Sequence, residues 1–132
     1  MTRAECVRQL LYDEGVVVFD HCPIKRKSIV SEDGYIGLSD QVECEAEEHC
    51  ILTHDKWHLD LGAFYTVCSP FQLREQVEYR VQKRTLMQLV PPEIVRMYIS
   101  VEMPLEYMLE ELEVTLPVFC EAVTLYKELG LI

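Results

Sequence analysis

The segment 40–61 contains neither proline nor glycine, and it places two histidines, His54 and His58, four residues apart. Ser39 or Asp40 can cap a helix at its start, with Glu43 completing a capping-box pattern, and Gly62 can end it. The segment is therefore expected to form one long helix. On such a helix the side chains of His54 and His58 lie on one face.

Two imidazoles one helical turn apart can donate ring nitrogens to a single ion. A catalytic zinc needs three protein ligands, and Glu78 follows His58 by 20 residues on the next expected helix, which begins after Ser69 and Pro70 and ends before Pro91. If the two helices pack antiparallel, Glu78 becomes the third ligand, and Gln82 can orient a ligand by a hydrogen bond. The alternative is a chance histidine pair in an acidic chain, with Asp55 as one more solvated carboxylate.

The remaining segments predict an α+β single domain over residues 1–132. A first helix is expected over 3–14, and "VVVFDHC" is expected to form a buried strand. A hairpin with a type I′ turn is expected at Asp33-Gly34, and short helices at "EIVRMYI", "LEYMLEEL" and "PVFCEAVTLYKEL". The expected architecture is an N-terminal helix and a small antiparallel sheet beside a helical core.

Composition limits the classes of function. The chain has 132 residues with 49% hydrophobic and 27% charged side chains, as expected for one globular domain. No apolar run is long enough to span a membrane, and no export signal is evident, so a cytoplasmic location is expected. The net charge of −11 disfavours direct binding to nucleic acid or to an anionic membrane. The six cysteines form no C-x-x-C pair and are expected to be reduced and mostly buried.

Three stretches together resemble the ImmA/IrrE family of metallopeptidases, particularly its small members linked to phages and integrative elements. They are "AEEHCILTHDKWH", "EYRVQKRTLMQLVPPE" and "LEELEVTLPVFCEAVTLY". Family sequences typically carry A-E-x-x-C-x-L-x-H-E-x-G-H, and the likeness covers roughly residues 34–128. It implies a gluzincin-like core in which Zn²⁺ is bound by His54, His58 and Glu78, and Asp55 takes the place of the general base.

The resemblance also implies a function. Members of this kind are zinc-dependent proteases, and some inactivate a helix-turn-helix repressor encoded nearby. A protein or peptide substrate, such as a phage-type repressor, is therefore expected. The mechanism implied is hydrolysis at zinc, with Asp55 taking the proton from the metal-bound water.

The chain departs from the family pattern at several positions. Asp55 replaces a Glu and withdraws the carboxylate by one methylene, which favours metal binding over efficient proteolysis. Trp57 replaces a small residue and needs space beside the helix, whereas Val81-Gln82 replaces Ala-Asn and keeps an amide. A degenerate regulatory or protein-interaction domain is the alternative function. A DNA-binding module on the C-terminal helices is a third, weakened by the negative charge.

Four other side chains have chemistry that a metal or catalytic site could use. Cys50 lies one turn before His54 and is expected to pack rather than bind metal. Tyr65 follows the metal helix and either polarises a substrate carbonyl or packs. His21 and His49 have no partner at ligand spacing, so exposed or turn positions are expected for both.

Overall fold

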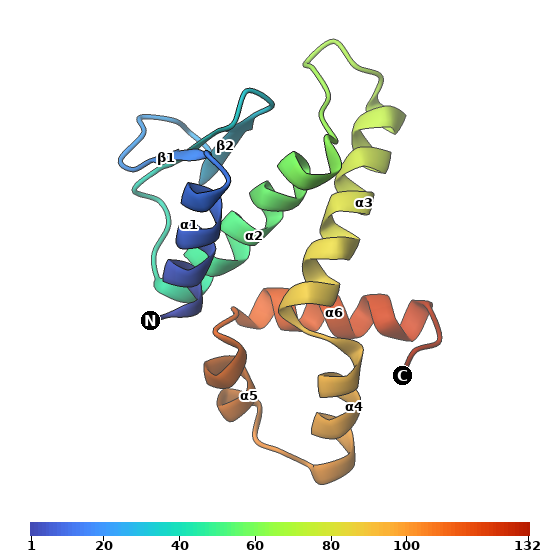
Figure 1. The fold of residues 1–132 in the computed structure, drawn as a ribbon. Coiled ribbons are helices and arrows are strands. Elements are labelled where there is room, and N and C mark those ends of the chain that lie inside the picture. Colours follow the sequence, from blue (N-terminus) through green and yellow to red (C-terminus); the bar gives the residue numbers. More distant parts are fainter.

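A computed structural model describes all residues, 1–132, as six helices and one small sheet (Figure 1). The α+β class expected from the sequence is confirmed. The elements, in chain order, are α1 (Arg3–Asp13), β1 (Val17–Phe19), β2 (Ser28–Ser31), β3 (Tyr35–Leu38), α2 (Glu45–Leu61), α3 (Phe71–Leu89), α4 (Pro92–Val101), α5 (Leu105–Leu112) and α6 (Leu116–Glu128).

The sheet is mixed, not antiparallel as the sequence predicted. Its strand order is β1-β3-β2, with β1 parallel to β3 and β2 antiparallel to β3. After β1 the chain crosses to the far edge before the hairpin returns β3 to the centre, and this crossover makes β1 and β3 parallel. β1 is also not buried: Val17 and Phe19 are about half exposed, whereas Val18 between them packs against the cluster that contains Val7 and Leu11 of α1.

The hairpin is present, but its turn is not the expected two-residue type I′ turn. Ser31 pairs with Tyr35, so three residues, 32–34, form the loop. The Gly34 N–H donates to the Ser31 carbonyl, and only Gly34 in this loop has a positive φ, at 95°. A type I turn followed by a glycine with positive φ has this form. The loop therefore has three residues, one more than the Asp-Gly dipeptide predicts.

Helix α2 begins at Glu45, about five residues later than the capping pattern predicted. The side chains expected to cap it bind elsewhere: Ser39 Oγ accepts from Gln41 N–H, and Asp40 pairs with His21. Cys44 is the residue before the helix and makes no side-chain cap. Residues 40–44 thus form a turn, and Val42 packs below it against the cluster under the sheet.

Three apolar clusters fix the long helices. Leu52 of α2 packs with Val7, Leu11, Ile36 and Leu38 from α1 and β3. At the other end, the C-terminal part of α3 packs with α4, α5 and α6 around the fully buried Tyr126. α2 runs toward the 62–70 loop and α3 runs back from it past α2 (Figure 1). The two helices share apolar contacts, because Cys50 of α2 belongs to the C-terminal cluster and Trp57 and Leu61 of α2 pack against a third cluster that contains Val77 and Val81 of α3.

Two further expectations concern the cysteines and the possibility of a membrane-spanning helix. All six cysteines are free, as expected, but only Cys50 is buried and four are exposed, so the expected burial was wrong. The four exposed cysteines lie on outer helix faces or in loops. At such positions the apolar nature of a side chain is not enough to bury it. None of the helices has the length and apolar character needed to cross a membrane.

His49 is buried, contrary to the expectation of an exposed position. Only 5% of its surface is exposed, and its Nδ1 lies 2.8 Å from the carbonyl oxygen of Glu113. A carbonyl can only accept, so Nδ1 carries the proton of this bond. The bond joins α2 to the end of α5, whereas His21 is exposed in a turn as expected.

Burial lowers the pKa of His49, so acid is expected to destabilise the protein through this residue. The stabilising effect of the neutral ring is fully present above about pH 6.5 and is lost as the pH falls, because the unfolded chain then binds a proton that the folded chain excludes. The free energy of unfolding, measured with urea, should therefore fall between pH 7.5 and 5.5. Replacing His49 with Gln should reduce the slope of that fall by at most about 1.4 kcal/mol per pH unit.

His21 provides the matched control, since its pKa is raised by the hydrogen bond and charge of Asp40. His21→Gln should not reduce the slope with which the free energy of unfolding falls in acid. An unchanged pH profile in His49→Gln would contradict the role assigned to the buried ring.

Candidate metal centre

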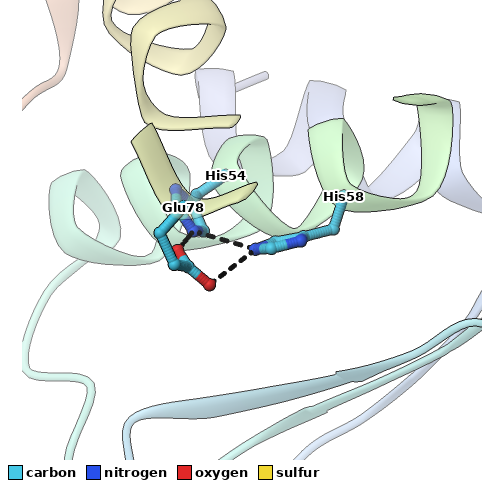
Figure 2. A group of neighbouring side chains, drawn as sticks. All are labelled: His54, His58 and Glu78. Carbon is cyan, nitrogen blue, oxygen red and sulfur yellow. Dashed lines mark hydrogen bonds and ion pairs between the residues drawn. The ribbon is translucent and has the colours of Figure 1, made fainter. Parts of the chain in front are cut away.

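The side chains of His54, His58 and Glu78 converge where α2 and α3 meet (Figure 2). His54 Nε2 lies 3.2 Å from His58 Nε2 and 3.1 Å from Glu78 Oε2, and His58 Nε2 lies 3.3 Å from Glu78 Oε1. The helical spacing of the histidines and the packing of α3 across α2 together produce this group. The structure thus brings together all three side chains expected as ligands.

The outer nitrogen of His58 defines its ring orientation. His58 Nδ1 lies 2.7 Å from the carbonyl oxygen of Ala63, just after the helix ends. Because that oxygen can only accept, Nδ1 must donate, and a neutral ring then presents a lone pair at Nε2. Gly62 makes this contact possible: it adopts the left-handed conformation, with φ of 60°, that turns the chain back toward His58.

The outer nitrogen of His54 is defined through two further residues. His54 Nδ1 lies 2.7 Å from Gln82 Oε1, and the Gln82 Nε2 group donates to both carboxylate oxygens of Glu121 at 3.2 Å. A carboxylate only accepts, so Glu121 fixes which end of the amide faces His54. His54 Nδ1 is therefore the donor and its Nε2 also presents a lone pair. The hydrogen bond expected between Gln82 and a candidate ligand is present, whereas the sequence did not predict the contribution of Glu121 on α6.

The geometry and chemistry of the group fit a metal ion. Three acceptor groups face one another, and all their ligand atoms lie within 4.8 Å, which is unfavourable unless a cation or a proton lies among them. Bonds of about 2.0–2.1 Å at tetrahedral angles would separate two zinc ligands by roughly 3.3 Å. The observed separations of 3.1–3.3 Å match this spacing.

Electrostatics also favours a cation in this position. Hydrogen bonds with His54 and His58 hold the pKa of Glu78 well below its usual range, against the opposing effect of burial. Burial lowers the pKa of His58, but its contacts with Glu78 and Ala63 outweigh this and raise it. The lowered pKa of Glu78 favours its ionised form, and the raised pKa of His58 favours positive charge on its ring.

Asp55 lies beside this group in a buried position. Its side chain is 4% exposed, and Oδ2 has no hydrogen-bond partner in the protein. Burial raises the pKa of Asp55, while the Ser28 hydroxyl and the two histidines oppose that shift. Asp55 also lines the pocket beside the three candidate ligands, and a carboxylate in such a position has the chemistry of a general base.

The group opens into a pocket of about 410 Å³. It is lined by His54, Asp55, His58 and Glu78 together with strand β2, the 62–70 loop, Arg26 and Arg74. Tyr65 from that loop donates its hydroxyl to Glu78 Oε1 at 2.7 Å. Tyr65 thus makes a polar contact inside the site, and its action on a substrate carbonyl stays a prediction.

Trp57 occupies the space between α2 and α3. Its Nε1–H donates to Gln88 Oε1 at 2.7 Å, and the Arg84 guanidinium lies 5.8 Å from the ring centroid. The bulk that the sequence flagged is thus accommodated beside α3. Cys50 is buried in the C-terminal cluster and contributes to packing, as expected, and not to the metal group.

The chain was compared with known proteins at three levels. No protein-family model matches it, no curated protein matches it, and no solved structure matches it. The geometry of the site therefore carries the functional argument.

Loss of the Gln82 amide is expected to weaken metal binding. Gln82→Leu fills similar space but cannot accept from His54 Nδ1, so that ring is no longer held in the orientation that presents Nε2. Loss of such a supporting contact typically costs 10–100-fold in metal affinity, and a zinc competition titration measures it.

Gln88→Leu is the matched control on the same helix, because Gln88 bonds to Trp57 and not to a candidate ligand. Equal affinities for the two variants would contradict the positioning role of Gln82.

Proposed function

We propose that the chain is a zinc-dependent metalloendopeptidase of the ImmA/IrrE type, with a gluzincin-like core. The observation that carries the proposal is the convergence of His54 Nε2, His58 Nε2 and the Glu78 carboxylate at zinc-ligand spacing. Two histidines and one glutamate are the ligand set of several zinc peptidases, and three protein ligands leave a position for water. The resemblance of the sequence to the family supports the same conclusion.

A bound zinc would polarise the scissile carbonyl and bring the pKa of a water molecule near neutrality. Asp55 acts as general base in this proposal, because this residue lines the same pocket and its Oδ2 has no hydrogen-bond partner in the protein. Tyr65 can redirect its hydroxyl from Glu78 to the carbonyl oxygen of a substrate. Gln82 and Ala63 hold the two imidazoles in the tautomer that binds metal.

The substrate in this proposal is a peptide segment of a regulatory protein, such as a helix-turn-helix repressor. Strand β2 is at the edge of the sheet, and Ser28, Ile29 and Val30 line the pocket. An extended peptide can pair with such an edge and pass the metal group. The repressor itself follows from the family resemblance alone.

One observation favours the second candidate, a degenerate domain with a regulatory or interaction role. Asp55 is largely buried, and its side chain is one methylene shorter than the glutamate of the family motif. A domain of this kind would keep the fold and the metal but turn over slowly, and its binding of a protein partner would be the function.

Metal analysis tests the proposal directly. Protein purified without chelator should contain close to one zinc per chain by mass spectrometry, and His58→Ala should lose most of it. His21→Ala serves as the control, because His21 is exposed and lies outside the group. If the parent protein contains no more zinc than His58→Ala, the metallopeptidase is refuted. Neither the peptidase nor the degenerate domain would then bind a metal at this site.

A further inference from the structure

The pocket beside the metal group carries two arginines from different parts of the chain. Arg26 precedes β2 and Arg74 is in the first turn of α3, and both line the pocket with Tyr65. Both guanidinium groups are close enough to act electrostatically on the Tyr65 hydroxyl. Two separate segments thus place positive charge in one pocket, beside the Tyr65 hydroxyl.

Neither arginine is neutralised within the protein. The lysines and arginines that form ion pairs are Arg3, Arg8, Lys27 and Lys56. Arg74 packs against the Phe71 ring, with its guanidinium carbon 5.9 Å from the centroid, and its buried Nε–H has no acceptor. A buried donor without an acceptor calls for an explanation, and a bound ligand group is one.

The carboxylates of the pocket do not provide that acceptor. Glu78 is engaged by His54, His58 and Tyr65, and Asp55 is enclosed beside the histidines. A divalent cation would offset the charges of these two carboxylates. The arginines would then remain as uncompensated positive charge in a protein whose net charge is −11.

We infer that Arg26 and Arg74 form a subsite for a carboxylate of the peptide, so that the pocket prefers segments with Asp or Glu near the position facing the metal group. The inference rests on the proposed function and specifies its substrate class. Guanidinium groups bind carboxylates through paired, charge-assisted hydrogen bonds. Because the chain as a whole repels acidic peptides, this local site is what makes their binding favourable.

The test uses two pools of labelled octapeptides that differ only in carrying Glu or Gln at one central position. Fluorescence anisotropy with the zinc-loaded protein measures their binding, and mass spectrometry measures any cleavage of the same pools. The Glu pool should bind or be cut about fivefold better than the Gln pool, and this preference should shrink at high salt.

The double variant Arg26→Gln, Arg74→Gln should lose the preference. Arg80→Gln is the matched control, since Arg80 is exposed on α3 outside the pocket. The single variant Arg26→Gln, at an exposed loop position, should lose part of the preference even if changing Arg74 disturbs folding.

Equal behaviour of the two pools, including no detectable binding of either, would overturn the subsite. So would an unchanged preference in both arginine variants, or displacement of the Glu pool by a single-stranded oligonucleotide at lower concentration than by acidic peptide. Zinc content is measured separately, so a protein that holds zinc without the preference refutes the subsite alone, whereas one without zinc refutes the proposed function.

Discussion

Replacing Asp55 with Glu is expected to raise the rate of peptide cleavage on the order of a hundredfold, because it moves the carboxylate about 1.5 Å closer to the reacting water and a misplacement near 1 Å costs that much. The position allows the change to act on the site, since Asp55 lines the pocket beside His54 and His58. Quenched fluorescent peptide pools with zinc-loaded protein provide the assay.

Two further variants make the result specific. Asp60→Glu adds the same methylene on the exposed end of α2, where Asp60 pairs with Lys56, and should leave the rate unchanged. Asp55→Asn should lie at or below the parent. If the parent already cleaves well and Asp55→Glu does not improve it, the shorter carboxylate is sufficient and the degenerate-domain alternative loses its main support.

The ligand positions could be predicted because they depend on local periodicity. His54 and His58 lie on one face of any α-helix. Pro70 and Pro91 mark the two ends of the next helix, so the place of Glu78 along that helix could be read from the sequence. Gln82 follows by one turn for the same reason. Glu121 and Ala63 could not be predicted this way, since α6 reaches Gln82 only through tertiary packing and Ala63 contacts His58 only because Gly62 reverses the chain.

The errors in the fold come from contacts that local patterns do not encode. Ser39 and Asp40 have the chemistry of helix caps, but other partners compete for them, Gln41 for the first and His21 for the second. The parallel pairing of β1 with β3 depends on where the 20–27 segment crosses the sheet. His49 is similar, because a histidine at a helical position is buried or exposed according to what packs on it, here the end of α5.

The zinc proposal also carries a stability consequence. Without a cation, His54 Nε2, His58 Nε2 and Glu78 bring acceptor atoms to 3.1–3.3 Å, and the folded chain must bear that repulsion or bind a proton. A metal that binds only the folded state removes this cost. The metal would add a polar link between α2 and α3, which already share apolar contacts through Cys50 and through Trp57 and Leu61.

Chelation is therefore expected to lower the thermal unfolding midpoint of the zinc-loaded protein on the order of 15 °C. Free metal at about 1,000 times its dissociation constant contributes about 4 kcal/mol, and each kcal/mol shifts the midpoint by several degrees for a chain of this size. Calorimetry with and without chelator measures the shift. His54→Ala should show almost no chelator effect, because it lacks a ligand, whereas His21→Ala should respond like the parent. A parent midpoint that chelator leaves unchanged would contradict a metal that bridges α2 and α3, whatever the activity of the loaded protein.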